Sequence, residues 1–513
     1  MNDSALTNLG GITSRWANSG RIAYIDATGP DVTSATTVTF DAFDDLCGRV
    51  AGGLQARGLE PGNRVGILAA NSVDYGACYL GIPRAAMVTV PLNTRQPAAT
   101  LTWIATDADL QLVIHDEAHR DQLPEGVPAI ELGSNEWHVL ISADPVAPVP
   151  IERDEVAVQM YTSGSTGRPK GVLLSHRGQL FSIDQYLNGV LPMDPDERLM
   201  VSAPMYHKNA GMQLKMALSL GGTVILLRRF DAEDYLRAIE AHGATAVSGV
   251  PTMFALMFAR PDLLSSLNRS SVRRASIGSA PMTQALFDQA KELFPQAGVT
   301  NGYGTTEVVA VFGGHPDQLP RPDIAVGYPL AAVETKLVDA NFDEAVADAR
   351  GHSQGELWVR SPGLMVGYHQ LEDVTAEKVT NGWYHTGDVM ESDANGWHFF
   401  VGRVDDMFSC GGENVYPGDV EQLLERHEQV HQASVVPVAD ELKGDLPVAF
   451  VVPTPGGAPT EAELRQWMID NGPAYQHPRA VWFIDELPLA GTAKIDRAVL
   501  TNEAAQRWTP RTP

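Results

Sequence analysis

The sequence predicts an α/β protein with more than one domain, and three observations lead to this fold class. The chain has 513 residues, more than a single hydrophobic core usually holds. Strand-like and helix-like segments alternate as far as Ile277, which is typical of parallel sheets flanked by helices. From about residue 330, short strands separated by turns replace this alternation, and a mixed α+β pattern follows. We therefore expect a large α/β region followed by smaller units.

The alternating pattern can be followed along the chain. Apolar residues recur at helical spacing from Phe43 to Leu54 and from Asp74 to Arg84, which predicts two helices. Strands are expected over residues 64–69, 87–92, 110–115, 156–161, 171–176, 223–227, 244–250 and 274–277. Repetition of this order predicts sheets whose strands are mostly parallel.

The pattern beyond residue 330 predicts two further units. Strands are expected over residues 335–338, 356–360 and 396–401, with turns such as Asn395-Gly396 between them, and hence a small antiparallel sheet or barrel. The C-terminal segment predicts helices over 415–427 and 461–470 and strands over 433–438, 447–453 and 481–485. Because Gly402–Asp406 separates the two patterns, we expect domains at residues 1–402 and 403–513.

Composition excludes several classes of function. The chain is 44% hydrophobic and 19% charged, with a formal net charge of −26. This charge disfavours binding to nucleic acids and anionic membranes, so an anionic substrate must be attracted by local cations. Three widely spaced cysteines, no signal-peptide pattern and no membrane-spanning apolar run predict a cytoplasmic protein. No residues have metal-ligand spacing, and the sequence leaves monomer and homodimer open.

The segment Tyr161–Gly171 (YTSGSTGRPKG) carries the clearest chemical signal. It combines three glycines, four Ser and Thr hydroxyls and two cations between two strand-like segments. Glycines let backbone N–H groups turn toward one point, and hydroxyls and cations add donors and positive charge. The alternative is a plain Ser/Gly linker, but the apolar flanks argue against it. The segment therefore predicts a loop that wraps a polyphosphate.

Two further segments have the residues needed to bind a nucleotide. In Asn301–Glu307 (NGYGTTE), glycines on both sides of Tyr303 let its ring lie flat over a planar ligand, and Glu307 can bind Mg²⁺ through oxygen. In Tyr384–Asp388 (YHTGD), an aspartate on a glycine turn can accept both hydroxyls of a ribose. Each segment in isolation is also compatible with an ordinary turn.

Taken together, these segments resemble the signatures of the adenylate-forming superfamily, which includes acyl- and aryl-CoA synthetases, peptide-synthetase adenylation domains and firefly-type luciferases. Four matching regions occur in the family's order from residue 161 to 496. The resemblance implies a large N-terminal region of two αβ sheets and a small β-barrel, followed by a small mobile α+β C-terminal domain. It also implies ATP and Mg²⁺.

The resemblance assigns nucleotide contacts residue by residue. Tyr303 would stack on adenine, Thr306 would contact the α-phosphate, and Glu307 would bind Mg²⁺ with Thr166 as a second ligand. Asn301 would reach the adenine edge. The full set implied for ATP and AMP is Thr162, Ser163, Gly164, Ser165, Thr166, Gly167, Lys170, Ser279, Ala280, Pro281, Asn301, Gly302, Tyr303, Gly304, Thr305, Asp388 and Arg403.

The same resemblance implies a catalytic lysine and a hinge. Lys494 matches the family's catalytic lysine, whose charge would stabilise the negative charge that develops between carboxylate and α-phosphate. The family usually has Gly before this lysine, and this chain has Ala493. Asp405 matches the position about which the C-terminal domain turns.

The acid pocket is expected around Ala203–Met212 (APMYHKNAGM). His207 matches a side chain that moves between the two half-reactions, and the segment has no carboxylate to pair with the ammonium of an α-amino acid. Lys208 could pair with an oxygenated group of the acid, although we expect it to point to solvent. Gly211 is expected to keep a pocket wall low. The residues predicted to contact the acid are His207, Lys208, Asn209, Met212, Gly278, Gly302, Gly304 and Val308.

The segment Met407–Pro417 resembles that of acyl- and aryl-CoA ligases. Gly411, Gly412 and Glu413 would line the pantetheine channel of coenzyme A. Where the family often has a lysine, this chain has Gln476, so Arg479 is the candidate contact for a CoA phosphate.

The resemblance therefore predicts an ATP-dependent carboxylic acid–CoA ligase that forms an acyl-adenylate and then a thioester. The aryl-CoA ligase pattern favours an aromatic or arylpropenoic acid. A medium-chain fatty acid, a dicarboxylate, and a stand-alone adenylating enzyme that loads a carrier protein remain alternatives. A non-catalytic homologue is disfavoured because Lys494, Glu307 and Asp388 are all present.

Overall fold

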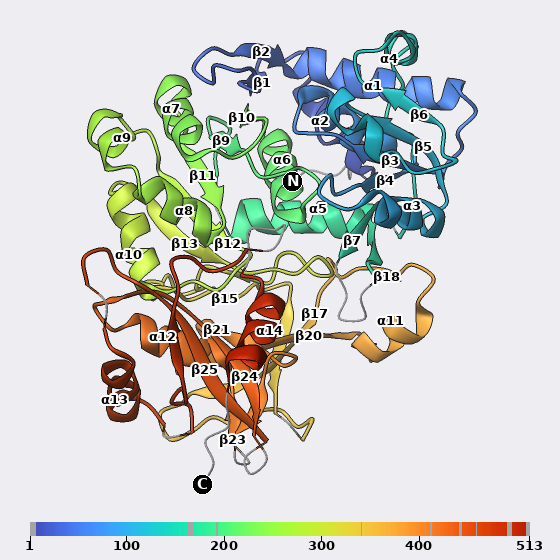
Figure 1. Ribbon diagram of the computed structural model, residues 1–513. Helices are drawn as coiled ribbons and strands as arrows, with labels where there is room; N and C mark the ends of the chain where they lie inside the picture. The colour runs from blue at the N-terminus through green and yellow to red at the C-terminus, as the bar shows by residue number, and fades with distance from the viewer. Residues whose placement is uncertain are drawn as a thin grey trace.

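A computed structural model describes residues 7–152, 154–162, 168–190, 193–339, 341–410, 413–440, 444–457, 459–473, 475–489 and 495–508. Two seven-stranded sheets with helices around them form the upper part of the molecule in Figure 1, and two smaller sheets form the lower part. The expected α/β class, with a large sheet-based region and a smaller C-terminal unit, is confirmed.

The first seven-stranded sheet carries three of the strands expected from the alternating pattern, β10, β11 and β12. Its neighbours pair in parallel, except that β2 is antiparallel to β1 at one edge. Its strand order is β13 (Gly298–Gly302), β12 (Arg274–Gly278), β11 (Ala246–Gly249), β9 (Arg198–Val201), β10 (Thr223–Leu226), β1 (Ile22–Asp26) and β2 (Thr36–Thr39).

The second seven-stranded sheet contains the strands on either side of the predicted phosphate loop. β7 and β8 form an antiparallel hairpin there, with Thr162 opposite Lys170. The other pairs are parallel, apart from the edge strand β18. The order is β18 (Gly367–Tyr368), β8 (Lys170–Ser175), β7 (Val156–Thr162), β4 (Val88–Pro91), β3 (Arg64–Leu68), β5 (Leu110–His115) and β6 (Ala129–Glu131).

Helices fill the space between the two sheets and cover their outer faces (Figure 1). The largest core joins Val65 and Ile67 of β3 to Leu226 of β10 through the helices between them. The inner helices are α1 (Phe40–Ala56), α2 (Val73–Arg84), α5 (His176–Gln185) and α6 (Lys208–Leu220), and α4 (Asn135–Leu140) packs against α1 and β6 at the edge of the molecule. The outer helices are α7 (Ala232–His242), α8 (Pro251–Phe258), α9 (Pro261–Ser266) and α10 (Gln284–Leu293) on the first sheet and α3 (Ala98–Asp107) on the second.

A five-stranded antiparallel sheet follows, as expected from the turns beyond residue 330. It consists of β16 (Glu334–Val338), β17 (Ser353–Arg360), β20 (Trp383–Ser392), β19 (Val379–Thr380) and β21 (His398–Arg403), with α11 (Glu372–Lys378) beside it and the short pair β14 (Phe312–Gly313) and β15 (Tyr328–Pro329). The last strand, expected over 396–401, starts and ends two residues later.

The C-terminal unit has its own core and an α+β arrangement. Its sheet contains β22 (Phe408–Cys410), β23 (Glu413–Val415), β24 (Val430–Asp440), β25 (Gly444–Pro453) and β26 (Val481–Phe483), and its helices are α12 (Pro417–Glu425), α13 (Glu461–Asn471) and α14 (Arg497–Arg507). The helix expected over 415–427 spans 417–425, and it begins at Pro417 because proline is favoured in the first turn of a helix.

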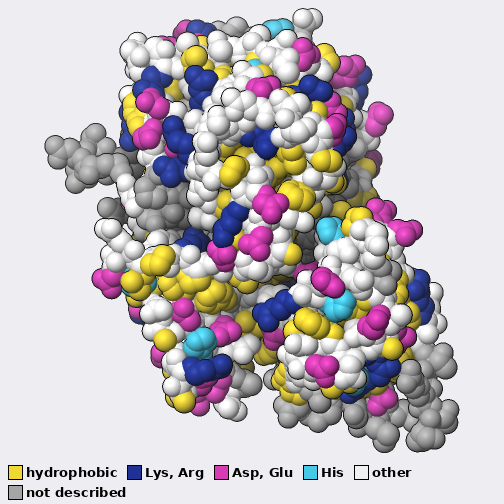
Figure 2. Space-filling model, turned by 90° about the vertical axis from the view of Figure 1, so that its left-hand side faces the viewer, with side chains coloured by type: hydrophobic (Ala, Val, Ile, Leu, Met, Phe, Trp, Pro, Cys, Tyr) yellow, Lys and Arg dark blue, Asp and Glu magenta, His cyan; other side chains and the backbone are white. Residues whose placement is uncertain are grey.

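The surface mixes charges of both signs despite the net charge of −26. On the face shown in Figure 2, Lys and Arg side chains are interspersed with Asp and Glu. Among the helices of the described residues, none is both long enough and apolar enough to cross a membrane.

Candidate active site

A cavity of about 1570 Å³ lies where the first sheet, α6, the antiparallel sheet and the C-terminal unit meet. Adjacent parallel strands β12 and β13 end here, with Gly278 opposite Gly302. The carboxyl ends of parallel strands are the usual ligand-binding edge of an open α/β sheet. The predicted residues that line the cavity are Thr162, Lys170, His207, Lys208, Asn209, Met212, Gly278, Ser279, Ala280, Pro281, Asn301, Gly302, Tyr303, Gly304, Thr305, Thr306, Glu307, Asp388, Arg403 and Asp405.

Asp388 connects two of the sequence segments and the predicted hinge. Its carboxylate accepts hydrogen bonds from the Tyr303 hydroxyl at 2.5 Å and from Nη1 of Arg403 at 2.6 Å. Arg403 also contacts Asp405 at 3.4 Å. Burial raises the pKa of Asp388, while the positive charge of Arg403 opposes this shift. The segments predicted to hold adenine and ribose therefore meet at one buried carboxylate.

Glu307 lies beside a tyrosine that the sequence segments did not include. The Tyr368 hydroxyl donates to Oε1 of Glu307 at 2.9 Å, and Nζ of Lys170 lies 5.7 Å from the centre of the Tyr368 ring. Tyr368 belongs to β18, whose backbone pairs with β8 directly after the phosphate loop. Because this contact depends on strand pairing between distant segments, no local pattern could have identified Tyr368.

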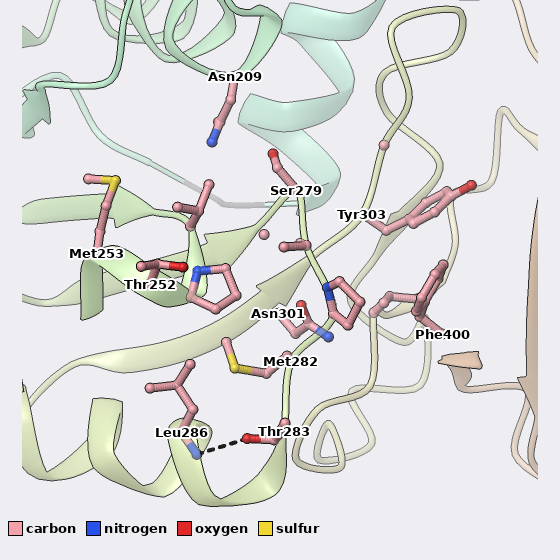
Figure 3. A pocket seen from close by; sticks show the side chains of 18 of the residues that line it. Asn209, Thr252, Met253, Ser279, Met282, Thr283, Leu286, Asn301, Tyr303 and Phe400 are labelled. Carbon is pink, nitrogen blue, oxygen red and sulfur yellow. Dashed lines mark hydrogen bonds between the residues drawn. The ribbon is translucent and has the colours of Figure 1, made fainter. Parts of the chain in front are cut away.

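The turns after β12 and β13 form one wall of the cavity (Figure 3). Ser279 has a φ of 67°, a left-handed conformation that is uncommon for residues other than glycine and often marks a functional site. Asn301 is fixed because its Nδ2 donates to the Ile324 carbonyl at 2.7 Å and Arg321 donates to its carbonyl. A Cβ on Gly304 would lie 2.5 Å from the Val309 carbonyl oxygen, so this turn requires glycine.

The first turns of α6 form the opposite wall. Asn209 points its amide nitrogen into the pocket in Figure 3, and its Oδ1 accepts a hydrogen bond from Gln213 Nε2 at 2.8 Å. His207 precedes the helix, and its ring lies 4.6 Å from that of Tyr206. The expectation that Lys208 points to solvent is wrong, because its Nζ is buried and the residue lines this cavity.

Two other predictions for the acid pocket differ from the structure. Val308 is fully buried and pairs with Leu364, so the neighbouring Val309 lines the cavity instead. Successive residues of an extended chain point to opposite sides, which explains the one-residue error. Gly211 faces the Tyr79 hydroxyl, 3.2 Å from where its Cβ would lie, rather than the cavity.

The C-terminal unit contributes the remaining wall. Leu489 and Ile495 form a β-bridge and both line the cavity, while Glu421 and Arg497 beside them form a salt bridge with oxygen–nitrogen distances of 2.6 and 2.7 Å. Lys494 lies outside the described residues, as do Ser163, Gly164, Ser165, Thr166, Gly167, Gly411 and Gly412.

Of the residues predicted to bind coenzyme A, the structure describes Arg479 and the backbone of Glu413. Glu413 begins β23, which is at the bottom of the molecule in Figure 1, far from α6. Arg479 contacts the His477 ring, and its backbone N–H donates to the Pro447 carbonyl at 2.7 Å. This arrangement brings both flanks of the Lys494 segment to the cavity, whereas β23 lies far from α6 and Arg479 does not line the cavity.

Comparison with known proteins identifies the family. Residues 14–369 match the family model of AMP-binding enzymes, and residues 419–494 match that of the AMP-binding enzyme C-terminal domain. The chain belongs to the AMP-binding enzyme family. The first match contains the 161–171 and 301–307 segments and the second ends at Lys494, while Tyr384–Asp388 lies between the two matches.

Individual AMP-binding enzymes resemble the chain over nearly its whole length. It is 34% identical to a feruloyl-CoA synthase from Amycolatopsis over 475 residues, which cover 90% of this chain and 92% of that protein. It is 30% identical to a fatty acid–acyl-carrier-protein ligase, ScoC of Streptomyces coeruleorubidus, over 90% of this chain and 91% of that one. The crystal structure of ATP-bound MatB from Rhodopseudomonas palustris superposes with a TM-score of 0.89 at 26% identity, covering 98% of this chain and 100% of that one.

The site chemistry of this AMP-binding enzyme fits a magnesium ion that is shared with a substrate. Among the described residues, no group of three or more His, Cys, Asp or Glu side chains could enclose a metal ion. Mg²⁺ commonly takes one or two carboxylates and completes its coordination with phosphate oxygens and water. Glu307 is suited to this role because Tyr368 fixes its carboxylate on the cavity wall.

Proposed function

We propose that the chain is an ATP-dependent ligase that joins an aromatic or arylpropenoic acid to coenzyme A through an acyl-adenylate. The observation that carries this proposal is the single cavity in which the Tyr303–Asp388–Arg403 cluster, Glu307 and the first turn of α6 meet. The side of this cavity formed by the Tyr303–Asp388–Arg403 cluster suits a nucleoside, and the side formed by the first turn of α6 suits an organic acid. The 34% identity with a feruloyl-CoA synthase favours an arylpropenoic acid.

In the first half-reaction, a carboxylate oxygen of the acid attacks the α-phosphorus of ATP. The bond from this phosphorus to the bridging oxygen breaks, and pyrophosphate leaves with the electron pair. Tyr303 and Asp388 would hold adenosine, Lys170 the leaving phosphates, and Thr306 the α-phosphate. Lys494 would stabilise the charge that develops between the reacting groups, and Glu307 would hold the Mg²⁺ that neutralises phosphate charge.

In the second half-reaction, the thiol sulfur of coenzyme A attacks the acyl carbonyl, and AMP leaves. The proximity of Leu489 and Ile495 to the cavity suits the first half-reaction. We propose that residues 403–513 then turn about Asp405 and bring Gly411, Gly412 and Glu413 to the cavity. Asp405 suits a hinge because its side chain is 60% exposed and stays in water during rotation.

A panel of acids tests this proposal. Pyrophosphate release is measured with ATP, Mg²⁺ and cinnamic, benzoic, medium-chain fatty and dicarboxylic acids, followed by detection of the acyl-CoA. We expect the highest kcat/KM with a cinnamic acid. Pyrophosphate release with only the fatty acid or only the dicarboxylic acid would contradict the proposed acid class.

The acceptor has one competing candidate, a carrier protein, because ScoC is a fatty acid–acyl-carrier-protein ligase by name. Incubating the adenylated enzyme with free coenzyme A or with a phosphopantetheinylated carrier protein separates the two. Thioester that forms on the carrier protein but never on coenzyme A would overturn the proposed acceptor.

A further inference from the structure

Lys208 is buried in the wall of the cavity without a hydrogen-bond partner for its ammonium group among the described residues. Burial of an unpaired charge is costly, and it lowers the pKa of Lys208 to about 7. Lys208 is also the first residue of α6, where the helix dipole adds further positive potential. Its position therefore suits the binding of an anion.

The charged neighbours of Lys208 indicate at which stage of the reaction an anion would stabilise its ammonium group. Glu307 favours the charged form of Lys208, and Lys215, two turns along α6, disfavours it. If Glu307 binds Mg²⁺ as proposed, its negative charge is neutralised by the ion. Lys208 would then lack a counter-charge at the stage when ATP and the acid are both bound.

The shape of α6 favours the acid over the phosphates of ATP. Lys208, Met212 and Met216 are spaced by four residues, so they follow one side of the helix, and all three line the cavity. An acid whose apolar body lies along the two methionines would direct its carboxylate toward Lys208. The phosphates, in contrast, are expected at the 162–170 loop and Lys170.

We propose that Lys208 binds the reacting carboxylate of the acid and positions it for attack on the α-phosphorus, as a second cation in addition to Lys494. This inference rests on the proposed function for the identity of the reaction. It predicts that Lys208 contributes to acid binding and adenylation, but not to the CoA half-reaction, because the acyl-adenylate no longer carries a free carboxylate.

Lys215 provides a matched control. It is also a buried lysine of α6, and burial also lowers its pKa to about 7. However, its Nζ donates to Gln179 and lies 5.6 Å from the Tyr79 ring, and the residue does not line the cavity. Lys208→Met therefore removes an ammonium group at a position with access to the acid. Lys215→Met removes the same group from the same helix at a position without that access.

The test is calorimetric titration with cinnamate and the neutral cinnamyl alcohol, in the presence of Mg²⁺ and a non-hydrolysable ATP analogue. Each protein also carries Lys494→Ala, so that the second cation does not contribute. With Lys208 present, we expect cinnamate to bind roughly 10- to 100-fold more tightly than the alcohol, the range for one charged hydrogen bond. Lys208→Met should abolish this preference, and Lys215→Met should retain it.

Several results would overturn the assignment. Lys208→Met could retain the preference for cinnamate, or it could weaken binding of the ATP analogue and not of cinnamate. The loss of binding caused by Lys208→Met could also appear only with 4-carboxycinnamate, which would show that Lys208 binds a second, non-reacting carboxylate. Lys208→Gln serves as an additional charge-removing variant, so a folding defect in one protein does not decide the outcome. Pyrophosphate release is measured with the protein that retains Lys494. If that protein releases none although cinnamate binding depends on Lys208, the proposed function is refuted while Lys208 is retained as an acid-binding residue.

Discussion

Helices α6 and α12 each contribute a wall of the cavity, and the two helices bury charges of opposite sign. On α6, burial lowers the pKa values of Lys208 and Lys215 to about 7. On α12, burial raises the pKa of Asp419 to about 7 and that of Glu425 to about 8, with like-charged neighbours adding to both shifts. The first pair belongs to the large sheet region, and the second to the C-terminal unit.

The difference shows what each wall contributes. Lys208 faces the space proposed for the acid, so its buried charge can be used by a ligand. Asp419 instead feels the negative charge of Glu391 on β20, so its ionisation would weaken the packing of α12 against the antiparallel sheet. We infer that the α6 wall binds substrate, whereas the α12 wall controls how firmly the C-terminal unit stays in this arrangement.

The largest expected effect comes from the catalytic lysine proposed for the C-terminal unit. Lys494→Ala should lower the rate of adenylate formation about 10²- to 10³-fold, the usual loss when a group that stabilises transition-state charge is removed. Thioester formation from supplied acyl-adenylate should remain largely intact. Pyrophosphate release and acyl-CoA formation are measured separately, and an equal loss in both steps would contradict the assigned role.

The next largest effect is expected for Lys215→Met, at a buried residue of α6 that does not line the cavity. Lys215 has a pKa of about 7 in the folded protein and about 10.4 when unfolded, so the unfolded state binds more protons between these values. The free energy of unfolding of the wild type should therefore rise through this pH window relative to that of the variant, by up to about 1.4 kcal/mol per pH unit. The buried Cys and Tyr side chains are the same in the wild type and in Lys215→Met, so their titration cancels in the difference between the two proteins. Chemical denaturation between pH 7 and 10 measures the difference, and parallel curves would refute it.

The sequence indicated local segments of the candidate site but not the contacts between distant segments. The segments around Tyr303 and Asp388 could be recognised because each contains its own glycines and polar groups within a few residues. Their direct hydrogen bond joins positions 85 residues apart, and only the fold brings them together. Nothing near Lys208 in the sequence indicated its burial, because that depends on how α6 packs beside Glu307. The α/β class, in contrast, follows from many alternating strand and helix segments, so an error in one segment does not change the predicted class.

The substitution Gly418→Ala is expected to weaken the contact between the C-terminal unit and the antiparallel sheet. A Cβ on Gly418, in the first turn of α12, would lie 2.4 Å from the Val401 carbonyl oxygen of β21. Gly418→Ala should therefore displace the C-terminal unit and slow adenylate formation by about an order of magnitude, which corresponds to about 1.4 kcal/mol. The CoA half-reaction from supplied adenylate should change less.

Gly402→Ala is the matched control at the same contact. There a Cβ would meet Tyr416 at 3.7 Å, an ordinary van der Waals distance. If both alanine variants slow adenylation equally, steric displacement of α12 is not the cause.

The smallest expected effect is a pH dependence that originates on the α12 wall. The pKa of Asp419 is about 7 when folded and about 3.9 when unfolded, so the folded state binds more protons between these values and stability falls as pH rises through them. Above pH 7 the ionised Asp419 faces Glu391, and the wild type should lose roughly two- to fivefold in adenylation rate, since such a charge pair is partly screened by water and salt. Asp419→Asn should remove this decline. The rates are compared between pH 6 and 9 at saturating acid. Both proteins retain Lys208, so the effect of its titration on the rate is common to them. Identical profiles for the two proteins would show that α12 does not respond to the charge of Asp419.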